Sequence, residues 1–206
     1  SSCIMGRLLT YILMRLLYHH PHPNGDNLMI IFLVFFLNLF KFFINKILLI
    51  DEEIMTIFKN KSKEIAWFVS NCYTTSKRKD LAKKIDEKMH VDIYGKCGKL
   101  KCPVDSEECY DLLQSDYKFY LSFENAICDQ YITEKLFRPL SRYIIPIVFN
   151  GGNMSLYAPP RSFIDANTFK NVKELVKYLN YLNDNPGEYI KYFWWKKYYR
   201  IKQHPT

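Results

Sequence analysis

Two hydrophobic patterns divide the chain. Residues 28–50 form one apolar block in which 19 of 23 residues are hydrophobic. From residue 61 onward, short apolar runs alternate with amphipathic stretches. The pattern therefore predicts an N-terminal segment, 1–60, that carries an apolar helix over 28–50, and a separate folded domain over 61–206.

Within 61–206, the period of the pattern changes repeatedly between that of a strand and that of a helix. Continuous apolar runs predict buried strands at 65–69, 91–94, 118–123 and 144–149, and a short one at 162–164. Amphipathic stretches predict helices at 77–89, 106–115, 171–182 and 188–200. A further helix should begin at Thr133, which suits an N-cap. Strands separated by helices indicate an α/β fold with a Rossmann-like parallel sheet.

The apolar block 28–50 leaves more than one structure open. A membrane-spanning helix needs about 20 mostly apolar residues, and the block is long enough. Lys41 and Lys46 oppose insertion, but they lie in its second half, where long side chains can reach the interface. The alternatives are a buried helix, or a stretch that does not belong to the mature fold.

The charge of the chain favours an anionic partner. Lys and Arg number 29 against 21 Asp and Glu, which gives a net charge of +8. Nucleic acid, a membrane surface and a phosphorylated small molecule all fit that charge. The nucleic-acid hypothesis has no support beyond the charge, so we expect no nucleic-acid partner.

Six cysteines are present, and five of them lie between Cys72 and Cys128. No CxxC pair occurs, so we expect no zinc site. Buried thiols and disulfides formed in a secretory lumen both remain open. The glycosylation sequons 60–62 and 153–155 favour the lumen slightly.

Candidate chemistry lies in the loops that should follow the strands, because ligands bind beyond the carboxyl ends of parallel strands. Arg78 and Lys135 stand at the starts of two predicted helices, where free N–H groups and the helix dipole attract anions. Glu134 could accept hydrogen bonds from a vicinal diol such as that of a ribose. No Asp-x-Asp occurs, so Arg and Lys rather than a metal would neutralise a diphosphate.

Two adjoining segments are more specific than the hydrophobic pattern. Residues 117–125 read YKFYLSFEN and residues 128–135 read CDQYITEK. Together they resemble the signature of the α1,3-fucosyltransferases. Further similar segments follow the family's order, at 66–72, 91–98, 145–148, 157–160 and 192–197. The resemblance covers roughly 61–200 and leans towards the invertebrate and plant type that fucosylates the N-glycan core.

The resemblance implies the C-terminal, donor-binding half of a GT-B glycosyltransferase. Such an enzyme transfers fucose from GDP-fucose to a glycoprotein N-glycan with inversion, and it requires no metal or other cofactor. A Golgi membrane location with a lumenal catalytic domain is implied as well. By motif position, Arg78 and Lys135 would bind the pyrophosphate and Glu134 the ribose. The resemblance also places further residues in the donor site: Asn125 and Tyr131, and more weakly Ser70, Asp92, Tyr94 and Glu124.

The sequence also departs from the family. The family's catalytic base is a Glu of an N-terminal acceptor domain that has no counterpart here, so we assign no catalytic residue. The alternative function is therefore an inactive, membrane-anchored protein that binds a GDP-sugar or serves in interactions. Pro139 removes an N–H that would bond to the Lys135 carbonyl, which predicts a short or bent helix.

Overall fold

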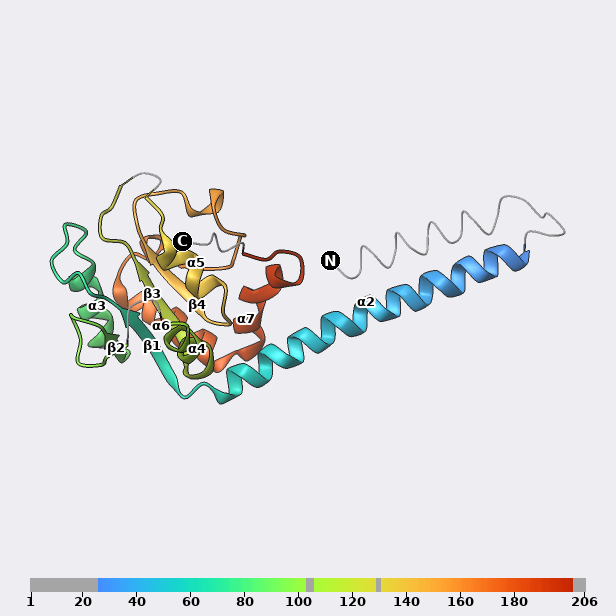
Figure 1. Ribbon diagram of the computed structural model, residues 1–206, viewed down its shortest axis with the longest axis horizontal. Coiled ribbons are helices and arrows are strands. Elements are labelled where there is room, and N and C mark those ends of the chain that lie inside the picture. The colour runs from blue at the N-terminus through green and yellow to red at the C-terminus, as the bar shows by residue number, and fades with distance from the viewer. Residues whose placement is uncertain (1–25, 103–105, 129–130, 202–206) are drawn as a thin grey trace. The chain divides into compact units, whose positions relative to one another are not determined.

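The computed structural model describes residues 26–102, 106–128 and 131–201, with side chains inside the first helix described at 34–42 and from Ile50 onward (Figure 1). The chain divides into two compact units after Leu48. The long helix α2, Asp26–Asn60, belongs to both units. The second unit begins at Leu49.

The centre of the second unit is a parallel sheet. Its strands stand in the order β2-β1-β3-β4-β5, and every pairing is parallel. Their bounds are β1 Lys63–Phe68, β2 Val91–Tyr94, β3 Tyr117–Phe123, β4 Ile145–Phe149 and β5 Ile164–Asp165. The prediction of an α/β fold with a Rossmann-like parallel sheet is confirmed.

Helices connect the strands and cover both faces of the sheet, as the crossovers of a parallel sheet require. Their bounds are α3 Arg78–Asp86, α4 Glu107–Asp116, α5 Glu134–Leu140, α6 Val172–Asp184 and α7 Pro186–Ile190. Short 3₁₀ helices lie at η1 Met154–Leu156, η2 Ala166–Thr168 and η3 Lys191–Lys197.

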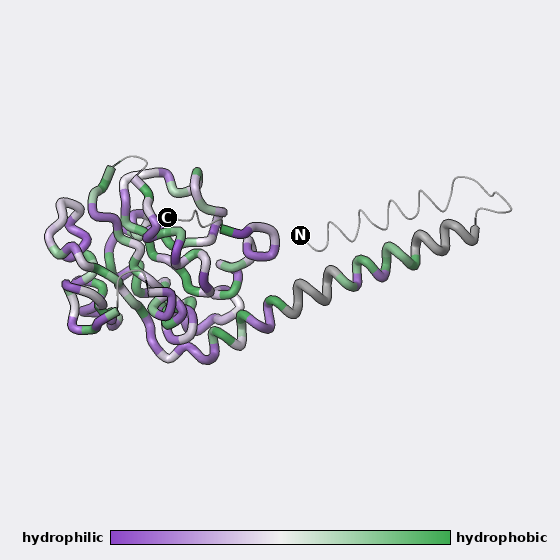
Figure 2. Tube along the Cα trace, in the orientation of Figure 1, coloured by the Kyte–Doolittle hydropathy of each residue, from purple (hydrophilic) through white to green (hydrophobic). Residues whose placement is uncertain are grey.

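The alternation of side chains along each strand builds a separate core on each face. On β1, Ile65 and Trp67 pack into a cluster with α3, α6, α7 and the end of α2. Ala66, between them, points to the opposite face, where it joins a cluster with α4. Hydrophobic residues accordingly concentrate along the strands in the middle of the unit, and hydrophilic residues on its outer loops (Figure 2).

Helix α2 confirms the prediction of a helix over the apolar block. Its described residues 34–42 are all exposed, and near its C-terminal end Ile54 and Phe58 are buried in the core of the second unit. Within the part of the chain that the structure describes, no helix offers a stretch long and apolar enough to cross a membrane.

The prediction of one helix over 188–200 is wrong. Pro186 begins α7, because proline is tolerated in the first turn of a helix. The chain then tightens into η3 rather than continuing as an α-helix. Tyr189, Tyr192 and Trp195 are all buried, and their spacing of three residues is that of a 3₁₀ helix, in which residues i and i+3 eclipse.

Disulfides account for four of the five cysteines in the described ranges. Cys72 is bonded to Cys97, and Cys102 to Cys109, while Cys128 is a free, exposed thiol. The sequence left thiols and disulfides open, and the structure has both. Cys3 lies outside the described residues.

Candidate functional site

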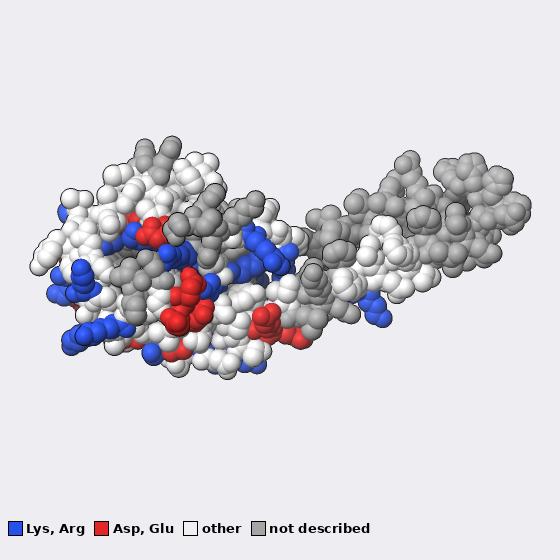
Figure 3. Space-filling model, viewed as in Figure 1, with Lys and Arg blue, Asp and Glu red and all other residues white. Residues whose placement is uncertain are grey.

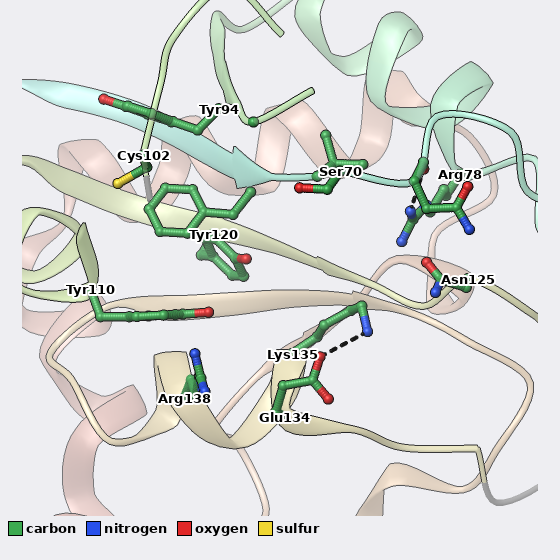
Figure 4. Close-up of a pocket in the computed structure, with 14 residues that line it drawn as sticks. Ser70, Arg78, Tyr94, Cys102, Tyr110, Tyr120, Asn125, Glu134, Lys135 and Arg138 are labelled. Carbon is green, nitrogen blue, oxygen red and sulfur yellow. Dashed lines mark hydrogen bonds and ion pairs between the residues drawn. The ribbon is translucent and has the colours of Figure 1, made fainter. Parts of the chain in front are cut away.

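A cleft of about 270 Å³ lies at the carboxyl ends of β1, β2 and β3. Ser70 and Asn71 reach it from the loop after β1, Gly95 from the end of β2, and Asn125 from the loop after β3. Figure 4 shows Arg78 and Asn125 at one end and Tyr110 and Arg138 towards the other. The cleft stands where a parallel sheet is expected to bind ligands.

Arg78 is the first residue of α3 and is 3% exposed. Its Nη1 donates to the Phe123 carbonyl at 2.8 Å, and its Nη2 donates to the Asn71 carbonyl at 2.7 Å. Burial lowers the pKa of the guanidinium, and the charge of Glu124 opposes that shift. Arg78 therefore joins the ends of β1 and β3 while it contributes fixed positive charge to the cleft.

Glu124 fixes the start of α5. Its carboxylate is 3% exposed and accepts from the Thr133 backbone N–H at 2.9 Å and from the Thr133 hydroxyl at 2.8 Å. The Thr133 hydroxyl in turn accepts from the backbone N–H of Lys135 at 3.4 Å. Thr133 is thus the N-cap that the sequence predicted. Glu124 acts on the cleft indirectly, because it holds Thr133 in place.

Glu134 and Lys135 enter the cleft from the first turn of α5 (Figure 4). Lys135 Nζ lies 3.1 Å from Glu134 Oε1 and 3.4 Å from Glu124 Oε2. Burial works against ionisation of Glu134, but the hydrogen bond and charge of Lys135 outweigh it and lower its pKa. Glu134 is therefore ionised at neutral pH.

Six of the nine predicted site residues line the cleft: Ser70, Arg78, Tyr94, Asn125, Glu134 and Lys135. Three lie elsewhere. Glu124 is buried behind Thr133, and Tyr131 is 37% exposed outside the cleft lining. Asp92 accepts a hydrogen bond from the Tyr117 hydroxyl at 2.5 Å, so it stabilises the sheet beside the cleft.

The sequence reasoning missed several residues of the cleft wall. Arg138 follows Glu134 by four residues, and residues i and i+4 share a helix face, so this spacing could have revealed it. Its guanidinium lies 5.1 Å from the ring centroid of Tyr110, another lining residue. Nothing in the sequence pairs Tyr110 with the cleft, because α4 approaches it only through the packing of the domain.

Within the described ranges, no group of three or more His, Cys, Asp or Glu side chains could hold a metal ion. The cations of the cleft are Arg78, Lys135 and Arg138, and its carboxylate is Glu134. Such a site can neutralise an anion and accept hydrogen bonds from hydroxyl groups. Fold and cleft together define a Rossmann-like α/β domain with a cleft lined by three cationic side chains and one carboxylate.

Comparison with known proteins identifies the family. The family described as glycosyltransferase family 10 (fucosyltransferase), C-terminal domain, matches residues 58–206, and the chain belongs to it. The chain is 46% identical over 151 residues to alpha-(1,3)-fucosyltransferase C of Drosophila melanogaster, and the matched region covers 73% of this chain and 36% of that protein. The chain is also 45% identical over 142 residues to alpha-(1,3)-fucosyltransferase fut-1 of Caenorhabditis elegans. That matched region covers 68% of this chain and 33% of the relative.

A solved structure shares the fold. The crystal structure of an alpha1,3-fucosyltransferase with GDP-fucose superposes with a TM-score of 0.59 at 22% identity, over 71% of this chain and 42% of that one. The likeness shows the fold, which is that of one half of a GT-B glycosyltransferase. The chain thus spans less than half the length of the proteins that it matches.

Proposed function

We propose that the chain contributes the donor site of a GDP-fucose-dependent α1,3-fucosyltransferase, which transfers fucose to a glycoprotein N-glycan with inversion. The observation that carries the proposal is the convergence of Arg78, Glu134 and Lys135 on one cleft at the carboxyl ends of the strands. The family match over 58–206 favours a transferase over the alternative of an inactive binding protein.

The proposal gives each charged group a task. Arg78 and Lys135 neutralise the diphosphate of the donor and stabilise the charge that develops as GDP departs. Glu134 accepts hydrogen bonds from the ribose hydroxyls. Asn125 completes the polar wall, and Tyr131 stays a predicted donor-site residue. These cations take over the work of a metal ion, so the proposal includes no metal and no other cofactor.

Inverting transfer needs a base that deprotonates the acceptor hydroxyl. Glu134 is unsuited to that role, because its pKa is lowered and the proposal commits its carboxylate to the ribose hydroxyls. We therefore propose donor binding for the described residues and assign the base to none of them.

The proposed location is the Golgi membrane, with the domain in the lumen. The bonds Cys72–Cys97 and Cys102–Cys109 support an oxidising compartment. The sequons 60–62 and 153–155 favour the same side of the membrane. Membrane attachment through 28–50 belongs to the proposal on the strength of the apolar composition of that block.

Calorimetric titration of the full chain with GDP tests the donor site. Lys135→Ala should weaken binding by about ten- to a hundredfold, because a charge-assisted phosphate contact contributes roughly 1.5–3 kcal/mol. Arg78→Ala should weaken binding at least as much, with circular dichroism to verify folding, since Arg78 also joins two strand ends. Lys173→Ala, an exposed site on α6, is the matched control. Absence of GDP binding by the folded wild type would refute the proposal.

A further inference from the structure

A strongly basic surface adjoins the cleft. It is made by the exposed lysines of α3 and its flanks and of the loop after β2, and we name it the lysine face: Lys77, Lys79, Lys83, Lys84, Lys88, Lys96, Lys99 and Lys101. The same stretch, 77–101, contains four carboxylates: Asp80, Asp86, Glu87 and Asp92. Figure 3 shows the positive side chains gathered at one edge of the domain, over α3 and the neighbouring loop.

The two segments of the lysine face are held together. The Cys72–Cys97 disulfide joins the loop that precedes α3 to the loop after β2. That second loop folds back onto the sheet, because the Gly95 N–H donates to the Leu100 carbonyl at 2.9 Å. The arrangement gathers like charges on one surface before any ligand arrives, which raises the local potential and favours a polyanion.

The positive charges of the lysine face are not neutralised by ion pairs within the described part of the domain. In the described part of the chain, none of its eight ammonium groups lies in an ion pair. Lys79 lies 6.0 Å from the ring centroid of Tyr73, which is 92% exposed. The face is therefore available to an anionic ligand from solution.

The lysine face continues directly from the cleft wall. Arg78 lines the cleft between Lys77 and Lys79, and Gly95 and Cys102 line it beside Lys96 and Lys101. We propose that the face binds an acidic glycan, a sugar chain that carries sulfate or carboxylate groups, and guides it towards the cleft. The glycan's role as acceptor rests on the proposed function, whereas its binding depends on the lysines alone.

The composition of the face favours a glycan over other polyanions. Every cation of the face is a lysine ammonium, which is a compact point charge. Such charges can pair with scattered sulfates and carboxylates, which do not need the bidentate fork of an arginine. Single-stranded nucleic acid is bound on several stacking aromatic rings, and only Tyr73 is exposed here. A membrane-surface helix needs an apolar face, and Leu100 is the sole exposed large aliphatic residue of 77–101.

The test measures glycan binding by the full chain in detergent. The probes are heparin fragments for sulfate, hyaluronan fragments for carboxylate, and dextran as the neutral control. We expect binding to one or both acidic probes and not to dextran, weakening steeply with salt. The variants K83E/K84E/K88E and K96E/K99E/K101E should each lose about tenfold or more in affinity at about 0.15 M salt. The matched control K59E/K170E/K173E carries the same charge change at exposed lysines outside the face that stand in no ion pair among the described residues, and it should stay within about twofold.

Several outcomes would overturn the proposal: unchanged affinity in both face variants, equal weakening in the control, or tighter binding to RNA or to anionic vesicles than to either acidic glycan. GDP titration of the same samples separates the two proposals. Glycan binding without GDP binding would refute the donor site and leave the lysine face intact. GDP binding without glycan binding would refute the lysine face as a glycan site and leave the proposed donor site intact.

Discussion

A proline inside α5 makes one buried hydroxyl important for the cleft. Pro139 has no N–H, so the carbonyl of Lys135, four residues earlier, lacks its helical donor. The Ser122 hydroxyl, from β3, donates to that carbonyl at 2.8 Å. Ser122 is 3% exposed. This hydrogen bond therefore fastens the sheet to the turn of helix that carries Glu134 and Lys135.

Replacing Ser122 by Ala tests this connection. The substitution leaves the partly buried Lys135 carbonyl without this partner, which costs about 1–3 kcal/mol of the free energy of unfolding. Pro139→Ala restores an N–H at the position that bonds to the Lys135 carbonyl in an ordinary helix. In that background the hydroxyl is no longer the sole donor, so Ser122→Ala should cost less. The double-mutant cycle should show a coupling of about 1 kcal/mol.

Urea denaturation of the wild type, both single variants and the double variant, followed by tryptophan fluorescence, gives the four free energies. The cycle cancels the packing that Pro139→Ala loses by itself, because that loss is common to both backgrounds. A cost below about 0.5 kcal/mol for Ser122→Ala, or the same cost in both backgrounds, would refute the reasoning. GDP titration of Ser122→Ala then reports whether the position of Lys135 depends on the bond.

Three further predictions concern charge, ligand contacts and cross-links. Burial lowers the pKa of Lys61 to about 7, although Asp116 opposes the shift. From about pH 7 to about pH 10 the unfolded chain then binds more protons than the folded one, so the stability of the wild type relative to Lys61→Met should rise as the pH rises. A stability difference that does not change with pH, measured by denaturation at several pH values, would contradict this prediction. Glu134→Ala should weaken GDP but spare inorganic pyrophosphate in calorimetry, because pyrophosphate has no ribose; equal losses would exclude the ribose contact. The Cys72–Cys97 bond closes a separation of 25 residues, so replacing both cysteines by Ala should cost about 2–4 kcal/mol in urea, and a loss below about 1 kcal/mol would contradict a stabilising cross-link.

The strands and the start of α5 were predictable because their signals are local. Apolar runs such as 65–69 and 118–123 recur as β1 and β3 within a few residues. Thr133 caps α5 with its own side chain. The short length of that helix also follows from Pro139, which the sequence displays directly.

The missed features depend on packing between distant segments. Arg78 was predicted as a phosphate ligand, but its bonds to the carbonyls of Asn71 and Phe123 exist only once β1 and β3 lie side by side. Tyr110 likewise reaches the cleft through the docking of α4. The aromatic positions 189, 192 and 195 display a three-residue spacing, yet the amphipathic pattern of 188–200 predicted a single helix.

The cations of the cleft differ in how firmly they are held, and this difference bears on how an anion enters. Arg78 is fixed by two backbone carbonyls, so it offers a rigid anchor. Lys135 is shared between a buried carboxylate, Glu124, and the Glu134 side chain, which is 57% exposed. A diphosphate can displace Glu134 from Lys135 at little cost, because an exposed ion pair contributes only about 0–1 kcal/mol. Under the proposed function, the released Glu134 would accept hydrogen bonds from the ribose hydroxyls, so one exchange would engage both the diphosphate and the ribose of GDP.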